Sequence, residues 1–310
     1  RQPKSPRHPR KPLCLPNSQR SPLGGSRVSK QQKVLITGGQ GQLATDLIQV
    51  FNSSDTVALS HQQLDITQPT DVETALRHHK PNVVINAAAF TDVDKCEDHP
   101  VKAKLVNSLG PENLIAVAKQ IDARVLQIST DYVFDGKLER PYIESDDTNP
   151  QSIYGQTKLQ GEQAMRDHDL IVRTSWLCGS HGSNILKTIV ALAQSDQPMK
   201  FVNDQTGHPS FTHDIAVTIK QLIEIEAQGT FHVTNQGPVS WYEFAYTILE
   251  MMGRPAHQVT PITTDQLDPP RPATRPTNSV LNNQALLAAG LTPPPHFRDS
   301  LPLLLKEICA

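Results

Sequence analysis

Apolar residues in this chain gather into short runs that alternate with more mixed segments from residue 33 onward. Runs rich in β-branched residues are typical of strands that are buried on both faces of a sheet. We predict strands at 33–37, 56–59, 83–86, 124–129 and 170–176, with helices at 42–51, from Pro69, at 100–120 and at 154–166. This alternation indicates an α/β protein with a doubly wound, Rossmann-like parallel sheet.

The pattern becomes irregular after residue 176. Helices are predicted near 182–195, 212–227 and 240–252, short strands near 199–202 and 230–234, and prolines concentrate at 255–295. Such a region suits a smaller lobe that covers a cofactor. We therefore expect a dinucleotide-binding domain at 33–176 and a mainly substrate-binding lobe at 177–310, with some segments of the lobe returning to the first domain.

The first 32 residues have no apolar periodicity and are rich in proline, serine and arginine. We expect a disordered basic tail. The tail lacks the apolar core of a secretory signal, so a cytoplasmic protein is expected. An organellar transit peptide and an upstream extension are the alternatives for this basic start.

Charge and composition narrow the class of partner. The tail carries eight basic residues and no acidic one, which leaves 21 basic against 31 acidic residues in the rest, a net charge of −10. A part that acidic is a poor candidate for nucleic acid or anionic membranes, and no apolar run is long enough to span a bilayer. The four cysteines are far apart and the twelve histidines form no metal pattern, so we expect reduced thiols and no metal site.

A glycine-rich turn opens the ordered part of the chain. It follows the first strand, contains Gly38 and Gly41, and leads directly into a helix. Glycines there allow a tight turn and let the backbone approach a pyrophosphate, while the helix N-terminus offers unpaired N–H groups. Ala44 is small enough for close packing of helix and strand. The turn therefore predicts a dinucleotide site.

Two later segments extend this prediction. The second strand ends in Ser60 and His61, without the acidic residue that would repel the 2′-phosphate of NADP, so NADPH is favoured over NADH. Asp65 lies slightly further on, either beside the adenine or as the N-cap of the next helix. The alanines at 87–89 let a flat ligand lie against the backbone.

A hydroxyl, a phenol and an amine stand where a carbonyl reductase needs them. The strand at 124–129 ends at Thr130, and open parallel sheets bind ligands just beyond the carboxyl ends of their strands. Tyr154 and Lys158 are one helical turn apart and face the same small molecule. We expect Thr130 to hydrogen-bond the substrate oxygen and Tyr154 to transfer its proton. Lys158 would lower the pKa of Tyr154 and hold a cofactor hydroxyl. The alternative is a surface tyrosine and lysine on an ordinary helix.

Aromatic and basic side chains are candidates for the substrate pocket. Trp176, at the end of a strand, is either a pocket wall or a core anchor. Arg271 and Arg275 lie in a proline-stiffened loop, where two guanidinium groups could grip a diphosphate or remain solvated.

Together these motifs resemble the extended short-chain dehydrogenases and, within them, the dTDP-4-dehydrorhamnose reductases, over about residues 33–308. The resemblance rests on several motifs: Thr37-Gly38-Gly39-Gln40-Gly41-Gln42-Leu43, residues 86–95, Ser129-Thr130-Asp131-Tyr132-Val133-Phe134, Tyr154-Gly155-Gln156-Thr157-Lys158, Arg173-Thr174-Ser175-Trp176 and residues 203–207. It implies reduction of the 4-keto group of a dTDP-linked sugar by NADPH or NADH.

The resemblance also implies roles for individual residues. Thr130, Tyr154 and Lys158 would be catalytic, and Thr130, Asp131 and Trp176 would meet the sugar nucleotide. The cofactor site would be lined by residues that include Tyr154 and Lys158 together with Gly38, Gly41, Gln42, Leu43, Asp65, Ile66, Ala88, Ala89, Phe90 and Thr91. Some relatives bind Mg2+ between the subunits of a dimer. No ligands for Mg2+ are identified in this sequence, so Mg2+ and the homodimer are left open.

Two other functions compete with the reductase. The resemblance extends to the non-catalytic, NADP-binding β subunit of methionine adenosyltransferase, but an intact Thr130, Tyr154 and Lys158 set favours an enzyme. An epimerase or dehydratase acting on another nucleotide sugar is the third candidate. It ranks last because Tyr132 follows Asp131 where dehydratases tend to have a glutamate.

Overall fold

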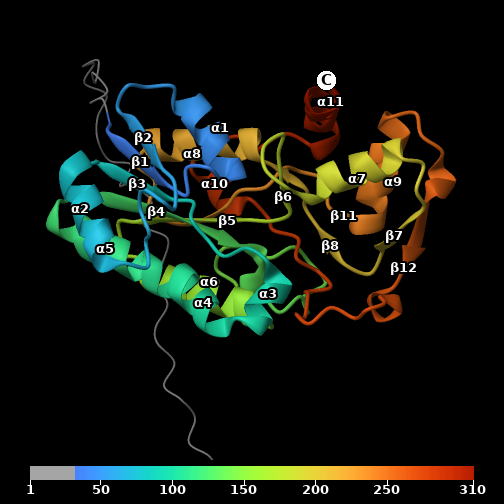
Figure 1. The fold of residues 1–310 in the computed structure, drawn as a ribbon, viewed down its shortest axis with the longest axis horizontal. Helices are drawn as coiled ribbons and strands as arrows, with labels where there is room; N and C mark the ends of the chain where they lie inside the picture. Colours follow the sequence, from blue (N-terminus) through green and yellow to red (C-terminus); the bar gives the residue numbers. More distant parts are fainter. Residues whose placement is uncertain (1–31) are drawn as a thin grey trace, which may run out of the picture.

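A computed structural model describes residues 32–310, and its centre is a six-stranded sheet in which all neighbouring strands are parallel (Figure 1). The strand order is β10-β5-β4-β3-β1-β2. The strands are β1 (Val34–Thr37), β2 (Thr56–Leu59), β3 (Val83–Asn86), β4 (Arg124–Thr130), β5 (Leu170–Thr174) and β10 (Gly229–His232). The chain moves from β1 out to β2 and then crosses to β3 on the other side, which creates a topological switch point. The predicted doubly wound sheet is confirmed.

Helices cover both faces of this sheet (Figure 1). Because successive strand residues point to opposite faces, Val34 and Ile36 pack on one helical layer and Leu35 on the other. The first layer consists of α1 (Gln42–Phe51), α8 (Thr212–Glu224) and α10 (Gln284–Ala288). The second includes α2 (Pro69–His79), α5 (Gly110–Gln120) and α6 (Ile153–Gln163). Strand β10 and helices α8 and α10 come from the C-terminal part of the chain, so that part completes the first domain.

The helix predicted at 100–120 has the expected extent but an irregular middle. It comprises α4 (Pro100–Lys104), a π-helical segment (Leu105–Leu109) and α5, and it is preceded by α3 (Val93–Asp98). Within the π segment, Asn107 bonds to both backbone polar groups of Phe90, at 2.9 and 3.0 Å. A π turn redirects a side chain that an α-helix would point elsewhere. Here it anchors the loop after β3.

The remaining elements form the lobe at one end of the molecule (Figure 1). Phe244, Ile248 and Phe297 lie in its separate hydrophobic core. The helices are α7 (Ile185–Gln194), α9 (Trp241–Met251) and α11 (Phe297–Cys309). Three two-stranded pairs join them: β7 (Met199–Val202) with β12 (Val259–Ile262), β8 (Thr206–Gly207) with β11 (Val239–Ser240), and β6 (Leu177–Cys178) with β9 (Ser210–Phe211). Short 3-10 turns lie at Asp131–Val133, Ala256–Gln258 and Thr264–Gln266.

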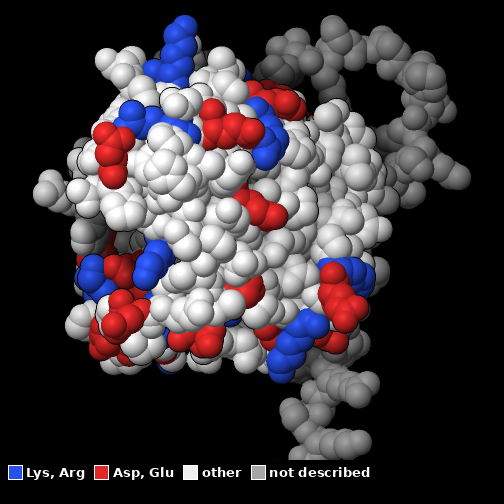
Figure 2. Space-filling model, turned by 90° about the vertical axis from the view of Figure 1, so that its right-hand side faces the viewer, with Lys and Arg blue, Asp and Glu red and all other residues white. Residues whose placement is uncertain are grey.

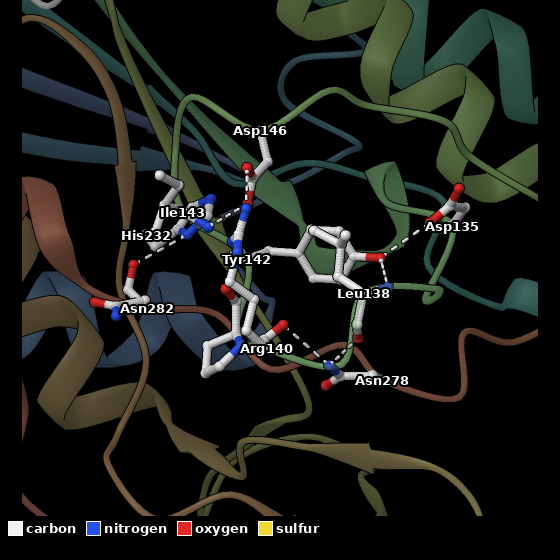
Figure 3. Close-up of polar contacts among 10 residues, drawn as sticks. Asp135, Leu138, Arg140, Tyr142, Ile143, Asp146, His232, Asn278 and Asn282 are labelled. Atoms are coloured by element: carbon white, nitrogen blue, oxygen red, sulfur yellow. Dashed lines mark hydrogen bonds and ion pairs between the residues drawn. The ribbon is translucent and has the colours of Figure 1, made fainter.

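The long loop between β4 and α6 is held in place by the C-terminal segment (Figure 3). Tyr142 is buried, its hydroxyl donates to Asp135 at 2.9 Å, and its ring stacks on Phe134. Asn278 donates to the carbonyl oxygens of Leu138 and Arg140 at 2.7 and 3.2 Å. This loop connects Thr130 with the helix that carries Tyr154, so its anchoring fixes the path between two candidate site residues.

One face of the lobe carries charged side chains of both signs (Figure 2). On the face drawn in Figure 2, basic and acidic side chains of the described residues are interspersed around a mainly uncharged centre. Among residues 32–310, no helix is long and apolar enough to cross a membrane. Cys96, Cys178 and Cys309 are free thiols. The predicted tail and Cys14 lie outside the described residues.

Candidate active site

A cavity of about 570 Å³ lies at the carboxyl edge of the sheet, between the first domain and the lobe. Eleven predicted site residues line it: Gly41, Gln42, Leu43, Ala88, Ala89, Thr91, Thr130, Asp131, Tyr154, Lys158 and Trp176. Six others do not: Gly38, Asp65, Ile66, Phe90, Arg271 and Arg275. The fold therefore brings the candidate catalytic residues and most of the candidate cofactor residues to one place.

The glycine-rich turn is shaped by close backbone contacts. Gly38 has a φ of 66°, and a β-carbon there would lie 3.0 Å from the backbone of Ala88. The N–H of Gly41 donates to the carbonyl of Gly38 at 2.8 Å. Helix α1 then begins at Gln42 without a side-chain cap, so its first N–H groups are available to an anion. Gly38 thus shapes the turn without lining the cavity.

Asp65 and Ile66 lie away from the cavity. The Asp65 carboxylate accepts from the backbone N–H and the hydroxyl of Thr67, at 2.9 and 2.8 Å, and Ile66 is buried in the core. Asp65 is not the N-cap of α2, because Gln68 occupies that position. The role of Asp65 and Ile66 beside the adenine stays a prediction.

Thr130 ends β4 and caps the 3-10 turn that follows. Its hydroxyl accepts from the N–H of Tyr132 at 3.2 Å and donates to Asp131 at 2.9 Å. Helix α6 starts beside it, with Ser152 as the N-cap and Tyr154 in the first turn. Gly155 makes this possible, because a β-carbon there would collide with the carbonyl of Tyr132. Tyr154 therefore lies next to the end of β4.

Burial is the largest cause of the pKa shifts of Tyr154 and Lys158 on α6. It raises the pKa of Tyr154, while the neighbouring Thr130 hydroxyl opposes the rise. Burial lowers the pKa of Lys158 to about 8, against the effect of Glu162. The Lys158 ammonium donates to the carbonyl of Ile128 at 2.5 Å. Burial is the largest cause of the shift, so the pKa of Tyr154 is raised overall and not lowered as expected. Tyr154 stays protonated at neutral pH, as a proton donor must.

Asp131 is a buried acid at the cavity. Burial raises its pKa to about 6, although the hydroxyls of Ser279 and Thr130 oppose the rise. Its Oδ2 atom has no hydrogen-bond partner among the described residues. Because an unpaired buried oxygen is costly, this atom is suited to accept a hydrogen bond from a ligand.

An aromatic wall lies where the lobe meets the segment after β5. The rings of Trp176 and Trp241 stack with centroids 3.5 Å apart and planes at 8°. Trp176 has a φ of 45°, and Gly207 leaves the space that its indole occupies. Beside this wall, Asn184 donates to Gln42 at 2.9 Å and so connects the lobe with the glycine-rich turn.

The two arginines do not line the cavity, although they lie near Tyr132, which does. Arg275 binds both carboxylate oxygens of Asp94, at 3.0 and 2.7 Å, and this pairing lowers the pKa of Asp94. Arg271 is an exposed residue near the pair. Their contact with a diphosphate stays a prediction, and for Arg275 it requires release from Asp94. Among residues 32–310, no group of three or more histidine, cysteine, aspartate or glutamate side chains could hold a metal ion.

A family model described as the RmlD substrate binding domain matches residues 32–309. The chain belongs to this family. The Bacillus subtilis spore coat polysaccharide biosynthesis protein SpsK is 38% identical to this RmlD-family chain over 280 residues, which are 89% of this chain and 97% of SpsK.

Solved structures agree with that assignment. The crystal structure of a dTDP-4-dehydrorhamnose reductase from Clostridium acetobutylicum has a TM-score of 0.85 and 41% identity, covering 89% of this chain and 99% of that one. The Bacillus anthracis dTDP-4-dehydrorhamnose reductase in complex with NADP also has a TM-score of 0.85, with 33% identity and the same coverage.

Several residues at the site of this RmlD-family member were not predicted from the sequence, among them Trp241, Asn184 and Glu162. Trp241 and Asn184 line the cavity from the lobe, where the sequence shows no motif. Glu162 lies behind the cavity and contacts two strands. Only Glu162 had a signal in the sequence, because it continues the four-residue spacing of Tyr154 and Lys158.

Proposed function

We propose that this chain is an NADPH-dependent dTDP-4-dehydrorhamnose reductase, which converts the 4-keto group of dTDP-4-dehydro-β-L-rhamnose to the hydroxyl group of dTDP-L-rhamnose. The observation that carries the proposal is the convergence of Thr130, Tyr154 and Lys158 on one cavity with the glycine-rich turn. The solved relatives that bear this name support it. The product would serve nucleotide-sugar and cell-surface polysaccharide biosynthesis.

The residues present fit a dinucleotide. Any side chain at Gly38 would press on the backbone after β3, and the uncapped start of α1 faces the same cavity. The end of β2 favours NADPH, since Ser60 and His61 place no carboxylate where a 2′-phosphate would bind. The glycine-rich turn and the start of α1 would hold NADPH, which would supply the hydride for the carbonyl carbon.

Side chains of the protein act on the carbonyl oxygen of the substrate. Thr130 donates a hydrogen bond to it, and Tyr154 transfers its phenolic proton to it as the alcohol forms. The Lys158 ammonium, one turn along α6, stabilises the phenolate that remains. Asp131 accepts from a sugar hydroxyl through its unpaired Oδ2 atom, and Trp176 packs against the sugar.

A coupled absorbance assay tests the proposal. The purified protein is mixed with NADPH or NADH and with the dTDP-4-keto sugar made in place by the preceding enzymes. We expect cofactor oxidation that depends on the sugar and is faster with NADPH. Cofactor binding without oxidation would contradict the enzyme and point to a regulatory subunit. Activity only with another nucleotide sugar would contradict the substrate.

We also infer a homodimer in the cytoplasm, with the dTDP-linked sugar as the partner molecule and without nucleic acid. The free thiols support the cytoplasm and the acidic ordered part argues against nucleic acid as a partner, while the dimer rests on the family resemblance alone. Light scattering after size-exclusion chromatography, with and without Mg2+, measures the subunit number. A monomer under both conditions would contradict the dimer.

A further inference from the structure

Helix α6 carries a third ionisable residue behind the cavity. Tyr154, Lys158 and Glu162 follow one another at intervals of four residues, so they lie along one face of the helix. Lys158 and Glu162 are 3% and 6% exposed. Buried charges are retained in proteins only when they are paired or hydrogen-bonded, so the partners of Glu162 are informative.

Both carboxylate oxygens of Glu162 are bound. Arg173 on β5 donates to Oε1 through Nε at 2.9 Å and to Oε2 at 2.6 Å. The hydroxyl of Ser129 on β4 donates to Oε1 at 2.5 Å. Ser129 and Arg173 are register partners in the parallel sheet, so their side chains reach the same helix. Glu162 thereby joins α6 to two adjacent strands.

A second bond joins the same helix to the same strand. The Lys158 ammonium donates to the carbonyl of Ile128, and Ser129, the next residue, donates to Glu162. Thr130 follows directly. Two consecutive turns of α6 are therefore bound to two consecutive residues of β4, immediately before the hydroxyl that meets the substrate. This clamp sets Tyr154 and Lys158 against Thr130.

We propose that Glu162 is a positioning residue for the reduction: through its bonds to Ser129 and Arg173 it fixes the end of β4 against α6, and it thereby sets Tyr154 and Lys158 against Thr130. The inference rests on the proposed function. Glu162 touches neither the substrate nor the cofactor site, since it does not line the cavity. It acts through Lys158 and through the end of β4.

Other ionisable groups do not replace Glu162 in this role. Burial is the main cause of the low pKa of Lys158, and Glu162 is the group that opposes it. The other ionisable residues of the region are Tyr154 on α6, Cys96 on α3, Asp131 and Tyr132 after β4, and Arg173 on β5. Without the carboxylate, nothing opposes the effect of burial on the pKa of Lys158, so Lys158 loses its proton at a lower pH.

Glu162→Gln tests the proposal. The alkaline limb of the kcat/KM profile, expected near pH 8 in the wild type, should move to lower pH. The pH above which NADPH affinity declines should also move to a lower value. This pH is measured by cofactor fluorescence in the absence of the sugar. This binding measurement separates the inference from the proposed function, because it does not depend on turnover.

The chain provides a matched control. Asp169 forms a similar buried pair with Arg166, at 2.8 Å, and accepts from the N–H of Val125 at the opposite end of β4. Asp169→Asn should lower the melting temperature and leave both pH profiles unchanged. If Glu162→Gln and Asp169→Asn both destabilise the fold but neither moves a profile, Glu162 is merely structural and the proposal is overturned.

A milder variant covers the case in which Glu162→Gln does not fold. Ser129→Ala removes one bond of the clamp and keeps the ion pair. Its kcat should fall about fivefold, the effect of one lost hydrogen bond, with NADPH affinity unchanged. An unchanged kcat in the folded Ser129→Ala protein would overturn the clamp.

Discussion

The two walls of the cavity are held by different forces. On the sheet side, polar groups are buried and have several partners: Asn86 bonds to side chains of both neighbouring strands, and Glu162 binds two strands at once. On the lobe side, the wall consists of the stacked rings of Trp176 and Trp241 and one hydrogen bond from Asn184 to the glycine-rich turn.

This difference between the two walls suggests that one wall fixes the reacting groups and the other binds the sugar. Disturbing a buried polar network leaves unpaired groups, so its geometry is tightly determined. Stacked and half-exposed rings tolerate small displacements at little cost. We therefore expect changes to the residues that act on the carbonyl oxygen to lower kcat. Changes on the lobe side, and at Asp131 where a sugar hydroxyl would bind, should raise KM or the dissociation constant.

The largest effect is expected at Tyr154. Tyr154→Phe removes the proton donor and keeps the ring, so kcat should fall by about 100-fold or more while NADPH affinity stays nearly constant. Steady-state kinetics and fluorescence titration measure the two quantities. Tyr246→Phe, at an exposed position of α9, is the control and should behave like the wild type. Wild-type turnover of Tyr154→Phe would disprove the assigned role.

Asp131 should produce a pH dependence on the sheet side. Its pKa is raised to about 6, so its carboxylate takes up a proton as the pH falls through that value. KM for the sugar should then increase about tenfold for each unit below it. In Asp131→Asn the KM should be high at every pH. An acid limb that Asp131→Asn retains would assign the titration to another group.

Trp241 tests the lobe side. Trp241→Ala removes the ring on which Trp176 stacks, so KM for the sugar should rise about fivefold with kcat within about twofold of the wild type. Trp241→Phe restores part of the stack, so its KM for the sugar should lie between the values of the wild type and Trp241→Ala. A large fall in kcat at unchanged KM would mean that the lobe takes part in the chemistry, and the separation of the two walls would fail.

Asn184 should have the smallest effect. Asn184→Ala removes the hydrogen bond to the glycine-rich turn together with the N-cap of α7 and the bond to the Gly179 carbonyl, so the NADPH dissociation constant should rise about threefold. Isothermal titration calorimetry measures it, with Ser195→Ala at the other end of α7 as the control. A dissociation constant equal to that of the wild type would show that the bond from the lobe does not support the turn.

Local pattern was sufficient for much of the first domain. β-branched runs predicted the strands, because both faces of a parallel strand are buried and its residues must be apolar. The meeting of the glycine-rich turn with the Tyr154 and Lys158 pair at one cavity could also be predicted, since each motif lies within one short segment at the end of a strand or the start of a helix. The lobe was less predictable, because its short strand pairs carry little periodicity.

The sequence by itself determined the succession of strands and helices along the chain and the chemical nature of the residues at the strand ends. The tertiary structure alone decided which distant residues meet. Arg275 pairs with Asp94 across 181 positions, and Trp241 stacks on Trp176. Glu162 had the right spacing, but its partners depend on the register of β4 and β5. Such contacts follow from packing, and neither spacing nor composition encodes them locally.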